Sequence, residues 1–257
     1  MLNELKQSLS VAWLRAVMNL KAESNRTYLG HLWLVLEPAI HVAVYYVVFG
    51  LIFKRGGEGF VIFLVIGVTH WLWFAKSVGG AATSILQGRG LLLKLHIPKI
   101  VFPLSVICLN LLRHFVVITI LFVFLLFYGI EPTATWFLYP LLFVIQLLLI
   151  FVISLLVAAI VVILPDLRIM VPPALQLLFF LSGVFFDLSR VPENYHHFLN
   201  LNPVFVLLQA YRDILLEGVI PDFNLLASIS GILLLAAVFI LFYFRRFDTT
   251  FSRLVLE

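Results

Sequence analysis

Charged side chains are scarce in this sequence. Only 12% of its 257 residues are Asp, Glu, Lys or Arg, whereas soluble domains carry about a quarter. Hydrophobic residues make up 63%. A soluble chain of this length could not bury so much apolar surface, so we expect lipid to be the solvent for most of these side chains. The composition therefore predicts an integral membrane protein.

Common catalytic and metal-binding motifs are also missing. Cys108 is the single cysteine, which excludes an internal disulfide and a multi-cysteine metal site. The sequence has no GxxxxGK[ST] phosphate-binding loop, no HExxH and no GxSxG. We therefore expect a chain that is not an enzyme, holds no cofactor and does not bind ATP in the usual way. The small excess of basic residues gives no reason to expect a nucleic-acid partner, because their positions relative to the membrane matter more than their total.

Long apolar runs dominate the sequence instead. A membrane-spanning helix needs about 20 mostly apolar residues. The predicted spans are residues 32–53, 60–82, 100–128, 136–164, 170–186 and 224–244. The fifth run is short. The pattern predicts an all-α integral membrane fold with six transmembrane helices in a single domain, residues 1–257.

The basic residues orient these spans. Lys and Arg accumulate on the cytoplasmic side of membrane proteins. With the N-terminus inside, eleven of the 17 Lys and Arg residues lie in inner segments and four lie in outer segments, while Lys76 and Arg113 lie within spans. This distribution predicts that both termini are cytoplasmic.

Three segments do not read as simple spans. Residues 1–25 predict an amphipathic helix in the inner membrane interface, or alternatively a cytoplasmic helix packed on a partner protein. Residues 87–99 predict a short apolar helix with basic ends, or a plain loop. Residues 191–217 contain a 14-residue helical stretch, which covers only about 21 Å. This segment should enter the outer leaflet and return, shielded by protein.

Ionisable groups inside the membrane are the first candidates for function. They are Glu37, His41, His70, Lys76, Arg113 and His114. No carboxylate is clearly placed near the midplane, which disfavours a proton-driven carrier. For Arg113, a functional role and a structural ion pair both remain open.

The order of several short motifs resembles a known family. Residues 26–38 read RTYLGHLWLVLEP, Asp166-Leu167 precedes a span that ends in Ser182-Gly183-Val184, and Val191-Pro192, Asn202-Pro203 and Arg212 follow. This ordered set is similar to the polysaccharide-exporting ABC-2 permeases. Pro165 departs from the pattern, because the family often has Arg before the Asp.

The resemblance implies a homodimer that works with two copies of a separate ATPase, which would hold ATP and Mg, in a bacterial inner membrane. The cargo would be a lipid-linked polysaccharide, with O antigen as the first choice and capsule or teichoic acid as relatives. Residues 87–99 would form the coupling helix that docks on the ATPase. Its candidate docking residues are Arg89, Lys94, Leu95, His96 and Lys99.

The resemblance also implies that residues 191–217 form the outer gate, with Asn202, Pro203 and Arg212 as its candidate residues. Arg212 should face water or an acidic partner such as Asp213 or Glu217. The candidate residues of the polysaccharide path are Tyr45, Tyr46, Trp71, Trp73, Phe74 and Arg113. Trp71 and Trp73 are two positions apart on a helix. One should line the path, and the other should face lipid or the partner subunit.

Three other classes of protein stay open at this point. The first is an ABC-2 permease for drug or lipid efflux. The second is a secondary carrier or channel, which predicts a midplane carboxylate or an internal repeat. The third is a membrane enzyme, which predicts a polar cluster at one face. The candidate cluster for an enzyme is Asp187, Arg190, Glu193, Arg212, Asp213 and Glu217.

Overall fold

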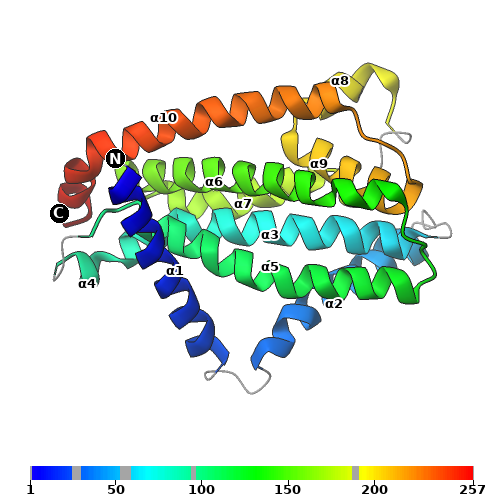
Figure 1. The fold of residues 1–257 in the computed structure, drawn as a ribbon, viewed down its shortest axis with the longest axis horizontal. Coiled ribbons are helices and arrows are strands. Elements are labelled where there is room, and N and C mark those ends of the chain that lie inside the picture. Colours follow the sequence, from blue (N-terminus) through cyan, green and yellow to red (C-terminus); the bar gives the residue numbers. More distant parts are fainter. Residues whose placement is uncertain (1, 25–29, 53–58, 94–96, 187–190, 257) are drawn as a thin grey trace.

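The computed structural model describes the backbone of residues 2–24, 30–52, 59–93, 97–186 and 191–256. Within these ranges the chain forms helices joined by short connections and contains no strand (Figure 1). The prediction of an all-α fold is confirmed. Helices suit an apolar sequence, because each helix satisfies its own backbone hydrogen bonds without water.

Five helical stretches in the described ranges are long and apolar enough to cross a bilayer. They are Trp33–Ile52, formed by α2 (Trp33–Tyr45) and the π-helix η2 (Tyr46–Ile52); α3 (Phe60–Gln87); α5 (Val101–Phe127); Ala134–Ile163, formed by the 3-10 helix η3 (Ala134–Leu138) and α6 (Tyr139–Ile163); and Phe223–Asp248 of α10 (Phe223–Leu256). Each coincides with one of the predicted spans.

The remaining predicted span, residues 170–186, is a shorter helix in the structure. Helix α7 comprises the 15 residues Leu167–Leu181, which extend about 22 Å and fall short of a hydrocarbon core of about 30 Å. It ends there because Gly183 has a φ of 65° and turns the chain back. Among the described residues, five helical stretches therefore reach spanning length on their own, whereas the sequence predicts six spans.

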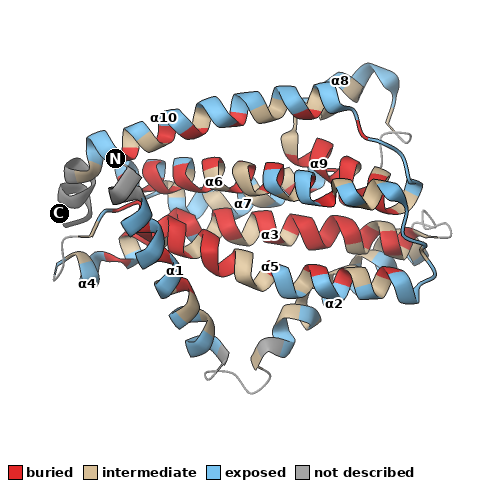
Figure 2. Cartoon of the chain, in the orientation of Figure 1, coloured by how far each residue is buried: buried red, intermediate tan, exposed pale blue. Residues whose placement is uncertain are grey.

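Helix α3 forms the centre of the bundle. It packs against both α5 and α6, and it also contacts α2, α7 and α9 (Pro203–Arg212). Leu64, Ile66, Ala81 and Ile85 are completely buried. Figure 2 shows α3 buried along most of its length, whereas α10 packs on α6 and exposes its outer side. The core therefore surrounds α3, and the periphery offers apolar surface to lipid or to other chains.

Helix α1 (Leu2–Ser24) lies along α5. Small residues make this contact, since Ser8, Ala12 and Ala16 are buried. Trp13 and Met18 are exposed on the rest of the helix. In the amphipathic helix predicted for residues 1–25, Ala12, Trp13 and Ala16 belong to one apolar stripe, but the structure buries the two alanines and exposes the tryptophan. Small side chains let two helices approach closely, and this packing selects the contact face.

The two ends of the bundle carry different elements. Helix α1 begins and α10 ends at the end where α4 (Arg89–Leu92) lies (Figure 1). Near the opposite end lie the 3-10 helix η5 (Glu193–Tyr195), α8 (His196–Asn200), α9 and the π-helix η6 (Asp213–Glu217). Together α9 and η6 cover 15 residues, so this segment cannot cross a bilayer.

Candidate transport site

Asn202 begins α9 and ties it to α7. Its side-chain Oδ1 accepts a hydrogen bond from the backbone N–H of Val204 at 3.0 Å, which caps the helix. Its Nδ2 donates to the backbone oxygen of Leu181 and to Ser182 Oγ, at 3.2 and 3.1 Å. Pro203 occupies the first turn, where its missing N–H costs nothing. The start of α9 is therefore fixed to the end of α7.

Arg212 is the last residue of α9 and fixes the other end of this helix. Its side chain is 1% exposed. Nη1 donates to the backbone oxygen of Gly183 at 2.7 Å, and Nη2 donates to that of Val184 at 2.9 Å. The guanidinium carbon lies 3.4 Å from the centre of the Phe63 ring, in cation–π contact. Arg212 thus joins α9 to the turn after α7 and to α3.

The expected surroundings of Arg212 need a correction in one respect. The sequence placed this side chain in water or against an acidic residue, and its burial excludes water. The structure buries it against carbonyl oxygens, which the tight turn at Gly183 directs toward α9. A buried guanidinium is tolerated where several acceptors compensate for lost water.

Two glycines make room for this arrangement. A Cβ on Gly67 of α3 would lie 2.4 Å from Arg212 Nη2, and a Cβ on Gly183 would lie 2.7 Å from the Phe205 ring. Gly183 also has the positive φ that favours glycine. Gly67 was not among the candidate residues, although a glycine inside an apolar helix often marks a close approach of another group.

Asp213 follows Arg212 at the start of η6. Burial raises the pKa of its carboxyl to about 6. The hydrogen bond that Gln209 Nε2 donates to it, at 3.1 Å, lowers the pKa, and the nearby Glu217 carboxylate raises it. The charge of Arg212 makes a smaller opposing contribution. This carboxyl therefore changes protonation close to neutral pH.

A buried group of rings lies beside Arg212, and sequence reasoning missed most of it. His70 Nε2 and the Tyr139 hydroxyl lie 3.1 Å apart, and the His70 ring stacks on Tyr211 with ring centres 3.7 Å apart. Gln146 Nε2 donates to the backbone oxygen of His70 at 2.9 Å. These contacts join α3, α6 and α9. The helical pattern places His70 within a span but does not reveal that Tyr139 and Tyr211 meet it.

The predicted path aromatics divide into two groups. Tyr46 is 36% exposed, and Tyr45 is partly buried with its ring centre 5.2 Å from that of Phe179. Trp71, Trp73 and Phe74 are only 5%, 3% and 2% exposed. The expectation that one tryptophan faces lipid or a partner is wrong.

Packing explains the burial of both tryptophans. Trp71 packs against Phe179 of α7, with ring centres 5.5 Å apart. Trp73 stacks on His114 of α5, with ring centres 4.1 Å apart. Helix α3 has neighbours on several sides, so residues that point in different directions are both covered.

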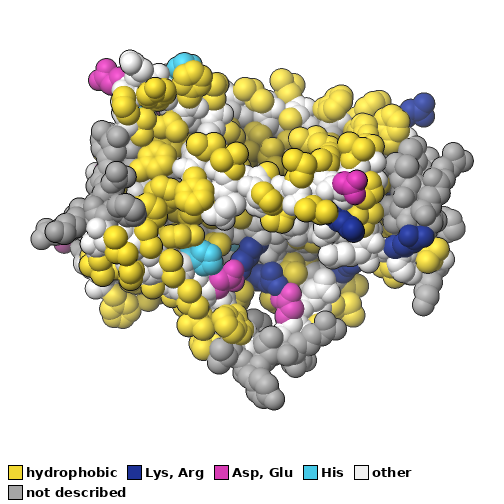
Figure 3. All heavy atoms as spheres, turned by 180° about the vertical axis from the view of Figure 1, so that it is seen from behind, with side chains coloured by type: hydrophobic (Ala, Val, Ile, Leu, Met, Phe, Trp, Pro, Cys, Tyr) yellow, Lys and Arg dark blue, Asp and Glu magenta, His cyan; other side chains and the backbone are white. Residues whose placement is uncertain are grey.

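Arg113 forms an ion pair with Glu23 of α1 and donates a hydrogen bond to Asn110 Oδ1 at 3.0 Å. Lys76 of α3 is paired in the same way with Glu37 of α2. Figure 3 shows acidic and basic side chains gathered on one face, among hydrophobic side chains. For Arg113 the structure thus provides the ion pair that the sequence left as one of two alternatives.

The predicted coupling segment is partly described. Lys94, Leu95 and His96 lie outside the described residues. Arg89 begins α4 and is exposed. Lys99 is buried instead, because its Nζ pairs with Asp248 Oδ2 at 2.9 Å and its backbone N–H donates to Oδ1 at 2.8 Å. Lys99 therefore anchors the segment to α10 and does not face a partner.

Two apolar side chains that the sequence analysis did not select are exposed at this end. Leu91 and Leu93 are 37% and 67% exposed. These two leucines leave apolar surface at the α4 end, which lipid or another protein can cover.

Comparisons with known proteins agree with the ordered motifs. The sequence model of the family described as "ABC-2 type transporter" matches residues 16–216. An O-antigen export system permease protein, RfbA of Myxococcus xanthus, is 33% identical over 85% of this chain and 86% of its own. RfbA of Klebsiella pneumoniae is 25% identical over 78% of each chain. The polysialic acid transport protein KpsM of Escherichia coli is 25% identical over 76% of each chain.

Proposed function

The chain belongs to the ABC-2 type transporter family, and on that premise we propose that it is the permease subunit of an ATP-driven exporter of a lipid-linked polysaccharide. The proposed cargo is O antigen. The observation that carries this proposal is the similarity to an O-antigen export permease along most of both chains. Capsular polysaccharide is the second candidate cargo, because the polysialic acid transport protein is also similar.

ATP hydrolysis in this proposal belongs to a partner. The sequence has no phosphate-binding loop, so a separate ATPase subunit supplies ATP and Mg. Two ATPase copies would serve a homodimer of this chain. The exposed Leu91 and Leu93, together with Arg89, support α4 as the docking surface. Lys94, Leu95 and His96, which lie outside the described residues, are also docking residues in the proposal.

The proposed orientation in the bacterial inner membrane places both termini and α4 in the cytoplasm. The distribution of Lys and Arg supports it. Because α7 alone is too short to cross the membrane, the proposed sixth span is α7 together with the residues that follow it, up to Phe186. Helix α7 contains Pro172 and Pro173, and most of its surface is exposed. A second subunit packed against this exposed surface would cover it in the dimer. In this orientation α9 and η6 re-enter the membrane from the outer side.

The proposed path runs between the exposed sides of α2 and α7 in the dimer. Tyr45 supports this route, because its ring is partly exposed and packs on Phe179 of α7. Tyr46 is also exposed, but it lines a groove toward α3 and α5, so the proposed path does not include it. Aromatic rings can hold sugar C–H faces without fixing each hydroxyl. Asn202, Pro203 and Arg212 hold α9 as the outer gate.

Deletion and complementation test this function in the source organism. Loss of the gene should remove the polysaccharide from the cell surface, and its lipid-linked form should accumulate inside. Restoring the gene should reverse both effects. Normal surface polysaccharide in the deletion strain would refute the proposal, and a changed sensitivity to drugs with unchanged polysaccharide would favour the drug-efflux alternative.

A further inference from the structure

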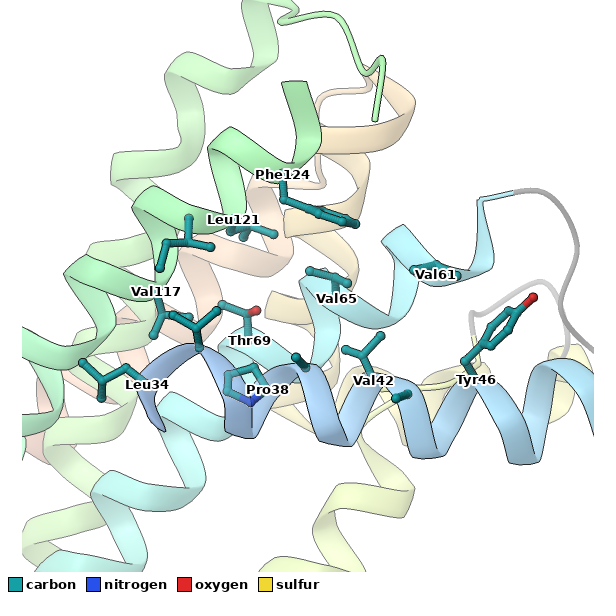
Figure 4. A pocket seen from close by; sticks show the side chains of 14 residues that line it. Leu34, Pro38, Val42, Tyr46, Val61, Val65, Thr69, Val117, Leu121 and Phe124 are labelled. Carbon is teal, nitrogen blue, oxygen red and sulfur yellow. The ribbon is translucent and has the colours of Figure 1, made fainter. Parts of the chain in front are cut away.

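An apolar groove with a volume of about 320 Å³ lies between α2, α3 and α5. Figure 4 shows side chains from all three helices pointing into it, among them Val42, Val65 and Leu121. The groove is open to the outside of the protomer, since Val35, Tyr46 and Ile120 on its walls are 36%, 36% and 37% exposed. A groove of this size falls within the usual range for small-molecule sites.

A second, smaller cavity of about 40 Å³ continues the groove. The two share Leu34, Pro38, Thr69 and Val117 as lining residues. The smaller cavity is otherwise lined by Leu72, Trp73, Lys76, Asn110, Arg113 and His114. The groove is therefore apolar along one part and carries charged side chains at its end.

The charged end is electrically balanced. Lys76 pairs with Glu37, and Arg113 pairs with Glu23. The side chains of Lys76 and Glu37 are 35% and 36% exposed, and those of Arg113 and Glu23 are 22% and 50% exposed. Each of the four side chains thus keeps some surface for further contacts. These four residues, called the charged row below, carry no net charge. They present positive and negative groups close together.

A buried nitrogen also lines this end. His114 is 3% exposed, and its Nε2 has no hydrogen-bond partner among the described residues. Buried polar groups are normally satisfied by protein, water or a ligand. The cavity beside His114 has room for about one water molecule or a single ligand oxygen.

The charged row lies off the midplane of the bilayer. Helix α3 extends about 24 Å from Lys76 to its start at Phe60, and α5 extends about 21 Å from Arg113 to its end at Phe127. Neither stretch contains Asp, Glu, Lys or Arg. Both lengths exceed half of a hydrocarbon core of about 30 Å. With these helix ends at one membrane surface, the row approaches the headgroups of the other leaflet.

We propose that this groove binds one zwitterionic phospholipid of the phosphatidylethanolamine type. An acyl chain lies in the apolar part, between Val42, Val65 and Phe124. The phosphate lies between Lys76 and Arg113, and the ammonium contacts Glu37 or Glu23. A zwitterionic headgroup matches the balanced row, whereas an anionic lipid would bring a net negative charge toward two carboxylates. The site requires a membrane location and does not depend on which cargo is exported.

Lipid retention by the purified permease–ATPase complex tests this site. The complex is exchanged in detergent against equal amounts of phosphatidylethanolamine, phosphatidylglycerol and polyprenyl phosphate, washed, and analysed by lipid mass spectrometry. Phosphatidylethanolamine should be retained preferentially. The Lys76→Gln variant should retain it about tenfold more weakly, which corresponds to the loss of one charge-assisted hydrogen bond.

A second variant covers the case in which Lys76→Gln fails to fold. Ala43 lines the groove and is exposed, so Ala43→Phe should fill the groove and abolish retention without changing a charge. Val238→Phe is the matched control, because Val238 is 70% exposed on α10 and lies outside the groove; it should retain lipid normally.

Four results would overturn the proposal. Preferential retention of phosphatidylglycerol or polyprenyl phosphate would assign the site to an anionic lipid. Retention of no lipid by the wild-type complex would leave the groove without the proposed occupant. Normal retention by Ala43→Phe would place bound lipid elsewhere. A disulfide across the dimer through Ala43→Cys would show that a second copy of the chain covers the groove.

Discussion

Arg212 connects α9 with the turn after α7 and with α3. Its two terminal nitrogens reach two carbonyl oxygens of the turn after α7. Lysine has a single ammonium group and cannot reproduce this planar fork. In Arg212→Lys at least one buried carbonyl loses its donor, at a cost of about 1–3 kcal/mol. Thermal unfolding of the purified complex should show the loss, and Arg168→Lys, at an exposed position, should not.

Gly67 tests the same contact from the opposite side. Gly67→Ala places a methyl group against Arg212, and overpacking of this kind costs about 1–3 kcal/mol. Gly90→Ala is the control, since a Cβ there would meet nothing within 4 Å. Equal unfolding temperatures for the two alanine variants would show that the Arg212 contact contributes nothing to stability.

We expect Asp213 to give the proposed outer gate a dependence on pH. The pKa of this buried carboxyl is about 6, above the ordinary value of 3.8. The carboxyl therefore keeps its proton at a higher pH than an exposed Asp does. The buried arrangement is therefore most favoured below the ordinary pKa of 3.8, and it loses this stability as the pH rises toward the pKa of about 6. We expect the wild-type complex in proteoliposomes to leak a small dye more at pH 7.5 than at pH 5. Asp213→Asn should leak little at both values, and a leak unaffected by pH or by the variant contradicts the assignment.

At the scale of elements, α4 is the proposed contact with the ATPase. Leu93 is 67% exposed, and an apolar anchor at an interface often accounts for more than 1 kcal/mol of binding. Leu93→Asp should reduce co-purification of the ATPase about tenfold. Arg89→Gln should have a mild effect, because exposed charges at a rim contribute little. Undiminished co-purification of the Leu93→Asp variant would exclude α4 as the docking site.

The elements also show what the sequence could and could not predict. The apolar runs predicted α2, α3, α5, α6 and α10, because a spanning helix needs a length that composition reveals. They could not predict the end of α7, which depends on a turn that meets Arg212. They also could not predict the burial of Trp73, since helical spacing shows which residues share a face and not which faces are covered.

At the scale of the whole molecule, the orientation in the membrane can be measured directly. Both termini and α4 should be cytoplasmic, and Tyr195 should lie outside. Lys94→Cys and Tyr195→Cys, each in a Cys108→Ser background, should differ when intact spheroplasts are treated with an impermeant thiol reagent. Only the cysteine at position 195 should react. Labelling at position 94 and protection at position 195 would reverse the proposed orientation.

The central claim is that this chain carries lipid-linked polysaccharide across the membrane with energy from a partner ATPase. Transport into inside-out membrane vesicles tests it most directly. Vesicles that contain the chain and its ATPase should move the polysaccharide into the lumen on addition of ATP, as measured by its protection from an added antibody. Vesicles without the chain should not. Equal protection without the chain, or transport driven by a proton gradient without ATP, would contradict the account.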